Sequence, residues 1–185
     1  MKRSIDVLDH ASDILKAVKQ GVLITAKKGD RVNAMTISWG SLGIEWGKPL
    51  FITYVRESRF TKEFLDATGE FTVNLPVGPF NKEITAVCGS KSGRDTDKIA
   101  ELGLTLEQPE VVAAPGIREL PLTLECRVVY QQEQDLALLG QADVERWYPV
   151  EEALGKRDVH TAYYAEVVAA YVIEKNLDEF TEPAQ

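Results

Sequence analysis

A segment of small, polar and aromatic residues, Asn-Ala-Met-Thr-Ile-Ser-Trp-Gly-Ser (33–41), has the composition of a ligand-binding strand. The pattern predicts a strand that ends in hydroxylated residues and an aromatic side chain, followed by a loop. Its backbone amides and hydroxyls could hydrogen-bond a planar heterocycle, with Met35 or Trp39 against the ring face. An ordinary strand with Met35 and Ile37 in the core explains the same pattern, and the pattern alone favours that structural interpretation.

A second segment, VRESRFTKEF (55–64), could bind phosphate. Two arginines and two hydroxyl side chains cluster where a predicted strand leads into a helix, namely Arg56, Ser58, Arg59 and Thr61. Free backbone N–H groups, the helix dipole and guanidinium groups together favour an anion. A capped helix with surface arginines beside Glu57 and Glu63 explains the segment equally well.

Motifs of several common enzyme classes are absent from the sequence. No G-x-G-x-x-G opens a helix after a strand, and no G-x-x-x-x-G-K-[ST] or G-x-S-x-G motif occurs. Only His10 and His160 are available for a catalytic triad or a histidine-rich metal site. Cys88 and Cys126 lack C-x-x-C spacing, and we expect Cys88 to be a small buried hydrophobe. Dinucleotide-fold, hydrolase and metalloenzyme interpretations are therefore weak.

Composition and charge limit the remaining possibilities. The chain has 185 residues, 44% of them hydrophobic, and lacks the roughly 20 consecutive apolar residues of a membrane span. No apolar segment follows its basic N-terminal residues, so we expect no secretory signal. Residues 1–98 carry 15 basic and 12 acidic side chains, whereas residues 99–185 carry 6 and 17. The acidic second half disfavours nucleic-acid binding. We expect a cytoplasmic protein that binds neither membranes nor nucleic acid, with one domain over residues 1–185.

Hydrophobic periodicity predicts two helices and four strands in the first half of the chain. The first helix covers 4–19, with Ser4 as its N-cap and Gly21 after its last residue. A turn at Gly29 joins the first two strands in a hairpin. The segment 39–49 contains three glycines and is predicted to be irregular. The predicted strands are 22–27, 31–38, 50–55 and 70–76, and a short helix is expected over 58–69.

The second half is predicted to contain two short helices and then three strands. The helices are 81–89 and 95–103, and the strands are 122–134, 136–149 and 161–174, with a loop over 150–160. About seven strands with few, short helices favour a closed or nearly closed antiparallel barrel, because closure removes exposed strand edges. Helices do not alternate with strands, so a doubly wound parallel sheet is disfavoured. An N-terminal helical segment (1–20) and a C-terminal tail (175–185) flank this domain.

The combination of these segments resembles the flavin reductase-like FMN-binding family, and within it the flavoredoxin-type branch. The resemblance rests on residues 33–76, on the segment VCGSKSGRDTDKIAELGLT (87–105) and on HTAYYAEVV (160–168). It implies a mainly β (α+β) fold, an FMN-binding split β-barrel, which is an antiparallel Greek-key barrel with short flanking helices. It also implies non-covalent FMN and a homodimer with cofactor sites near the subunit interface.

The resemblance further implies the residues that bind the cofactor. The strand that lines the isoalloxazine maps onto Asn33, Ala34, Met35, Thr36, Ser38 and Trp39. The segment near the ribityl phosphate maps onto Arg56, Ser58, Arg59 and Thr61, and a further approaching segment maps onto Ser92, Gly93, Arg94 and Lys98. In the last strand, Ala165 stands where the family usually has glycine, and its methyl group could crowd the substrate side.

The resemblance implies cofactor chemistry, in which the protein supplies placement and electrostatics. The first hypothesis is an NAD(P)H-dependent reductase that transfers hydride through FMN to flavin, a ferric complex or another small acceptor. His160 could contact the nicotinamide or the acceptor, or it could be a structural histidine at a strand entry. The second hypothesis is a flavoredoxin-like electron carrier with a protein redox partner and no nicotinamide site. A storage or sensing protein without turnover is a third. No motif distinguishes NADH from NADPH or identifies the acceptor.

Overall fold

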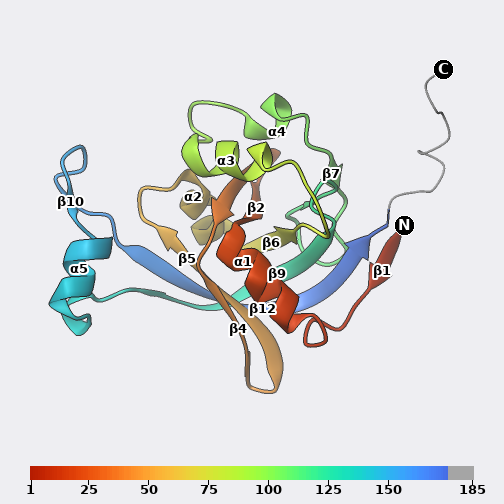
Figure 1. Cartoon of the computed structure of the whole chain (residues 1–185), viewed down its shortest axis with the longest axis horizontal. Helices are drawn as coiled ribbons and strands as arrows, with labels where there is room; N and C mark the ends of the chain where they lie inside the picture. Colours follow the sequence, from red (N-terminus) through yellow and green to blue (C-terminus); the bar gives the residue numbers. More distant parts are fainter. Residues whose placement is uncertain (175–185) are drawn as a thin grey trace.

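One antiparallel sheet of eight strands organises residues 1–174, which are the residues that the computed structural model describes (Figure 1). Its main path runs in the order β3-β2-β6-β9-β12-β5-β4, and β1 pairs with β12. The strands are β1 (Lys2–Ser4), β2 (Val22–Lys28), β3 (Arg31–Ile37), β4 (Gly40–Glu45), β5 (Lys48–Arg56), β6 (Glu70–Leu75), β9 (Leu122–Glu133) and β12 (His160–Ile173). The predicted tail, 175–185, lies outside the described residues.

The sheet is open at one place, between its two end strands β3 and β4. These strands follow one another in the chain, linked by Ser38 and Trp39, yet no ladder joins them within residues 1–174. The predicted fold class, a mainly β split barrel with few helices, is therefore confirmed. The two linking residues, Ser38 and Trp39, are exposed at this opening, whereas Met35 and Ile37 at the end of β3 are buried.

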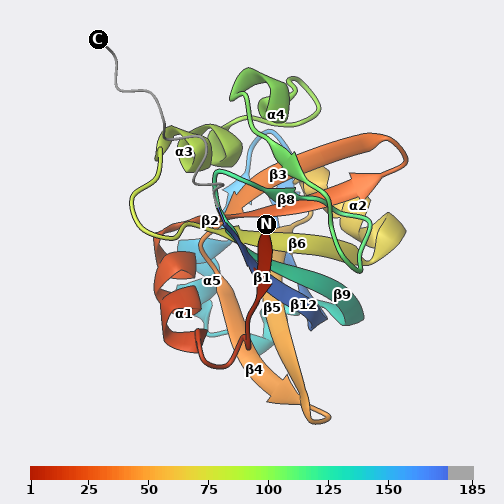
Figure 2. The same ribbon diagram turned by 90° about the vertical axis from the view of Figure 1, so that its right-hand side faces the viewer.

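Helices cover the sheet on two sides, as the view in Figure 2 shows. The main core lies between the strands, α1 (Ala11–Gln20) and α2 (Phe60–Thr68), around Phe51, Phe71 and Tyr163. A second, smaller apolar cluster lies beneath α3 (Glu83–Ser90) and α4 (Lys98–Glu101). It includes Cys88, which is buried as expected, and burial raises the pKa of its thiol. A minor pair of strands, β7 (Leu106–Glu107) and β8 (Gly116–Ile117), completes this side. No helix within residues 1–174 is long and apolar enough to cross a bilayer.

The N-terminal prediction is wrong in its first half. The helix begins only at Ala11, whereas Ser4 is extended and pairs with Tyr171 in β12. Asp6 explains the late start, because its carboxylate accepts the backbone N–H of Leu8 at 2.9 Å and so stabilises a turn. The predicted end of the helix at Gly21 is correct.

The segment expected to be irregular, 39–49, forms most of a hairpin between β4 and β5. Trp46 and Gly47 make its two-residue turn, both with positive φ (51° and 73°). Gly40 is required for close packing, because a Cβ there would lie 2.9 Å from the ring of Phe51. The glycines therefore serve the hairpin and do not interrupt it.

The predicted strand 136–149 is also wrong. The chain forms a 3₁₀ turn, Leu136–Leu138, and then helix α5, Gln141–Trp147. Its residues are mostly Leu, Ala, Gln and Glu, which lack the β-branching that favours strands. The predicted loop that follows contains a small hairpin of β10 (Val150–Glu151) and β11 (Lys156–Arg157). The helix predicted over 95–103 shortens to α4, with Asp97 as its N-cap.

Candidate functional site

Two adjoining pockets open at the split in the sheet, and they share Met35, Thr36 and Arg59. The aromatic pocket, of about 370 Å³, lies between the end of β3, the linking residues 38–39, the end of β5 and the start of β12. The polar pocket, of about 160 Å³, lies between β3, the start of α2 and the segment that follows α3. An elongated ligand could therefore place one end in each pocket.

The polar pocket is rich in cations. It is lined by Arg59, Lys91, Arg94 and Lys98. Lys98 is almost fully buried, and its ammonium group donates to the backbone oxygens of Lys91 (3.1 Å) and Cys88 (3.4 Å). Burial lowers the pKa of Lys98, and the nearby Arg59 acts in the same direction. An anion bound here would relieve both effects.

The side chains of the polar pocket differ in how free they are to bind a ligand. Arg94 donates to the backbone oxygen of Ser58 (2.9 Å) and pairs with Glu63 (2.7 Å). Lys91 pairs with a carboxylate in α4. Arg59 makes no side-chain hydrogen bond or ion pair with any other part of residues 1–174. It stands at the first turn of α2, whose N–H groups lack helical partners. Arg59 is thus the guanidinium that is free to bind an anion shared between the two pockets.

The wall of the polar pocket depends on an unusually close approach to Gly93. Asn33 is buried and its amide donates to the hydroxyl of Thr61 at 2.7 Å, which joins β3 to α2. The same Asn33 side chain lies so close to Gly93 that an added Cβ would be 2.0 Å from its oxygen. Arg31 also donates to the Gly93 carbonyl oxygen at 2.5 Å. Gly93 is therefore the residue that lets the loop after α3 close over β3.

A buried carboxylate fixes the turn between β5 and α2. Asp158, just before β12, accepts the backbone N–H of Ser58 (2.9 Å) and the Ser58 hydroxyl (2.6 Å). The guanidinium of Arg56 donates to the backbone oxygens of Asp158 (2.7 Å) and Trp147 (2.9 Å). The helix predicted over 58–69 begins later, because its N-cap is Arg59 and the hydroxyl of Ser58 is bound to Asp158.

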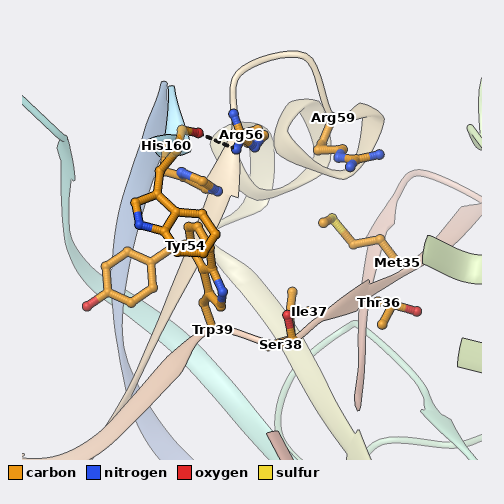
Figure 3. A pocket seen from close by; sticks show the side chains of 10 residues that line it. Met35, Thr36, Ile37, Ser38, Trp39, Tyr54, Arg56, Arg59 and His160 are labelled. Atoms are coloured by element: carbon orange, nitrogen blue, oxygen red, sulfur yellow. Dashed lines mark hydrogen bonds between the residues drawn. The ribbon is translucent and has the colours of Figure 1, made fainter. Parts of the chain in front are cut away.

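The aromatic pocket is built from neighbouring rings, of which Trp39 and Trp147 meet edge to face, whereas Trp39 and His160 are tilted by 42°. The Trp39 ring lies 5.4 Å from that of Trp147 and 5.0 Å from that of His160, measured between centroids. Figure 3 shows Trp39 and His160 on one side of the pocket and Met35 on the other. His160 is buried, and burial, reinforced by the charge of Arg56, lowers its pKa to about 4. The imidazole is neutral at pH 7, so the rings of this pocket are uncharged, and its charged groups are the guanidiniums of Arg56 and Arg59.

The structure brings almost all of the predicted binding residues to the two pockets. The predicted residues that line one or both of them are Asn33, Met35, Thr36, Ser38, Trp39, Arg56, Ser58, Arg59, Thr61, Ser92, Gly93, Arg94, Lys98 and His160. Ala34 is the exception, because it is fully buried in the smaller apolar cluster. Arg56, expected near a phosphate, lies in the aromatic pocket, and the Thr36 hydroxyl is bound to the Thr85 backbone oxygen at 2.6 Å.

Several residues of the site carried no signal in the sequence. Lys91 lies beside predicted residues, but its neighbours Ser90, Ser92 and Gly93 are typical of a solvated turn. Trp147 fell within a segment predicted to be a strand, and only the helix brings it next to Trp39. Asp158 lies in a predicted loop, about 100 residues from Ser58 in the chain, and pairing across such a separation leaves no local pattern.

The comparisons with known proteins agree with this geometry. Residues 16–182 match the family described as "Flavin reductase like domain", and the chain belongs to that family. An uncharacterized protein, YddH, of Escherichia coli is 33% identical over 149 residues, which cover 76% of this chain and 77% of that protein. An uncharacterized protein of Archaeoglobus fulgidus is 32% identical over 104 residues, but this match spans only 56% of this chain and 58% of that protein.

Solved structures with the same fold include two flavoredoxins. That of Methanosarcina acetivorans is 27% identical, with a TM-score of 0.62, and the match covers 85% of this chain and 70% of that one. That of Desulfovibrio vulgaris (Miyazaki F) is 24% identical, with a TM-score of 0.64, and the match covers 83% and 69%. An NADH:FAD oxidoreductase of Streptomyces globisporus is 18% identical, with a TM-score of 0.59, and covers 83% and 75%. The likeness to the last two establishes the fold.

Replacement of Gly93 tests the close approach at the wall of the polar pocket. In Gly93→Ala, the new methyl group must displace Asn33 and break its hydrogen bond to Thr61, so we expect unfolding free energy to fall by about 1–3 kcal/mol. Gly89→Ala is the matched control, because its Cβ would lie 3.4 Å from Thr36, near ordinary contact distance. Urea unfolding measures both. Equal stability of the two variants would contradict the assignment of Gly93.

Proposed function

We propose that this protein binds FMN, with the phosphate in the polar pocket and the isoalloxazine in the aromatic pocket. The observation that carries the proposal is the junction of the two pockets at Met35, Thr36 and Arg59, which joins a cationic site to an aromatic one. The donor set fits FMN, because guanidinium, ammonium and helix N-terminal groups bind phosphate and flat apolar walls bind a flavin ring. Membership of the flavin reductase-like family supports the same ligand.

We further propose that the protein is an oxidoreductase that takes hydride from NAD(P)H and passes electrons to a small acceptor. Bound FMN would supply the redox chemistry, and the chain would hold the ring, exclude water and leave one face open. The described side chains suit such a role, because the pocket holds a neutral histidine and no pair of carboxylates for acid–base work. The related fold of an NADH:FAD oxidoreductase supports this proposal.

The alternative is a flavoredoxin-like electron carrier that receives electrons from a redox protein. Similarity to the flavoredoxins of Methanosarcina acetivorans and Desulfovibrio vulgaris favours it. A carrier needs an exposed ring edge and a docking surface, but no nicotinamide site. The two proposals share FMN and differ in the donor, so one experiment separates them.

Retention of FMN and its dependence on Arg59 test the cofactor. Purified protein, mixed with FMN and desalted, is expected to retain a flavin spectrum near one FMN per chain. Arg59→Ala should weaken FMN binding by about 10- to 100-fold, because a charge-assisted bond to phosphate is lost. Arg127→Ala, which removes a surface arginine paired with Glu70, is the control. Quenching of flavin fluorescence gives both dissociation constants. A colourless desalted protein would remove the cofactor proposal altogether.

Anaerobic reduction separates the enzyme from the carrier. We expect NADH or NADPH to bleach the bound FMN within seconds, and admission of an acceptor to restore its colour. Stopped-flow absorption follows both steps, with dithionite as the reference for complete reduction. Bleaching by dithionite or a reduced redox protein, but by neither nicotinamide, would establish the carrier in place of the reductase.

We propose in addition that the protein is a homodimer that uses the tip of the β4–β5 hairpin. Ile44 and Trp46 are 58% and 68% exposed there, and Trp46 occupies a left-handed turn position that side chains of its size rarely adopt. An exposed, strained tryptophan suits a surface that another chain covers. The family resemblance, which implies a dimer, motivates the choice of partner.

The hairpin is tested by Trp46→Asn, because asparagine tolerates the left-handed turn and the hairpin is kept. Light scattering of the wild type should give about twice the chain mass of 20.6 kDa, and the variant should shift toward monomer. Val77→Ser, which removes an exposed apolar side chain elsewhere, should leave the mass unchanged. A monomeric wild type, or a variant that stays dimeric, would refute this interface.

A further inference from the structure

A hydrogen-bonded chain of three side chains runs away from the aromatic pocket. The hydroxyl of Tyr148 donates to the side-chain oxygen of Gln134 at 2.5 Å, and the same hydroxyl oxygen lies 2.9 Å from Nδ1 of His160. Tyr148 and His160 are 4% and 6% exposed, so water does not compete for these bonds. The backbone N–H of Gln134 also donates to the His160 backbone oxygen at 2.9 Å, which fixes both ends of the chain.

The protons in this chain can be assigned by counting. A phenol carries one proton, and the Tyr148 proton is committed to Gln134, whose oxygen has none to give. Burial raises the pKa of Tyr148, so the phenol keeps its proton at pH 7. The Tyr148 oxygen must therefore accept the N–H at Nδ1 of His160. Because a neutral imidazole has one N–H, Nε2 then carries a free lone pair.

The surroundings of His160 keep it neutral. The rings of Trp39 and Tyr148 lie against the imidazole, with centroid distances of 5.0 and 5.5 Å, and Arg56 and Arg59 both oppose a positive charge on it. The carboxylate of Asp158 acts in the opposite direction, but burial outweighs it, and the pKa lies at about 4. No group within residues 1–174 is hydrogen-bonded to Nε2, and His160 lines the aromatic pocket. His160 therefore offers the pocket a hydrogen-bond acceptor on a ring that stays uncharged.

We propose that Gln134 and Tyr148 are positioning residues that hold His160 as its Nδ1–H tautomer, so that Nε2 accepts a hydrogen bond from an N–H of a planar ligand in the aromatic pocket. The inference rests on the proposed function and adds a specificity rule to it. The proposed reductase binds two ligands that carry such a donor. They are FMN, at the imide N3–H of the flavin ring, and NAD(P)H, at the carboxamide of its nicotinamide. Ligands that lack the N–H leave Nε2 without a partner and bind more weakly.

The tautomer is tested on the protein without added ligand. The chain has two histidines, so ¹⁵N-histidine labelling gives only the signals of His10 and His160. We expect His160 to show a protonated Nδ1 and an unprotonated Nε2 from pH 8 down to pH 6. Tyr148→Phe should abolish this preference, whereas Tyr130→Phe, which breaks a similar Tyr–Gln bond on the exposed part of β9, should not. A protonated Nε2, or a cationic ring at pH 6, would overturn the proposal.

The specificity rule is tested with two analogues that lack the donor, N3-methyl-FMN and reduced 3-acetylpyridine adenine dinucleotide. We expect one of them to bind about 3- to 10-fold more weakly than its parent, and the affected analogue identifies the donor as flavin or nicotinamide. In Tyr148→Phe this discrimination should disappear, while Tyr130→Phe should retain it.

The outcomes of the two tests are distinct. Equal discrimination in the wild type and in Tyr148→Phe, or no discrimination against either analogue, would overturn the proposed role of His160 even if FMN and NAD(P)H both bind. A protein that binds neither FMN nor NAD(P)H would refute the proposed function and, with it, the specificity rule. The NMR measurement would still decide the tautomer, because it uses no ligand.

Discussion

The site depends above all on a single buried carboxylate. Asp158 is 2% exposed and bridges two segments that are distant in the chain, because its two oxygens bind the backbone and side chain of Ser58. A buried charge of this kind is stable only when its hydrogen bonds are complete, and removal of one partner is costly. The bond fixes where β5 ends and α2 begins, which places Arg59 at the junction of the two pockets and Arg56 against Tyr148.

The positive charge of the site is concentrated in the polar pocket. The four cations of the polar pocket all come from residues 59–98, the half of the chain with a basic excess. Two of them already have carboxylate partners, Glu63 for Arg94 and Glu101 for Lys91. Lys98 and Arg59 lack carboxylate partners within residues 1–174. A bound phosphate would pair with these two cations, which supports the proposal that the polar pocket binds phosphate.

The parts of the fold that follow local rules could be predicted from the sequence, and the parts that depend on distant contacts could not. The β2–β3 hairpin follows from β-branched runs around Gly29, and α2 ends at Gly69 as its left-handed C-cap requires. The β4 strand was missed because its turn uses Trp46, a residue that sequence rules do not place at positive φ. Helix α5 was missed because its apolar residues are exposed and show no clear period.

The same distinction applies to the site. The residues of β3 and α2 were assigned through the resemblance to the family, because the pattern of the two short segments fits an ordinary strand and a capped helix as well. The role of Arg56 could not be predicted from the sequence. Its guanidinium is oriented by the backbone oxygens of Trp147 and Asp158, which lie about 90 to 100 residues away in the chain. The protonation state of His160 could not be predicted either, because it follows from burial and from the hydrogen bonds with Tyr148 and Gln134. The sequence leaves open whether His160 contacts a ligand or is structural, whereas in the folded chain burial keeps its ring neutral at pH 7. The chemistry of the pocket is therefore decided by the contacts of the folded chain more than by its residue types.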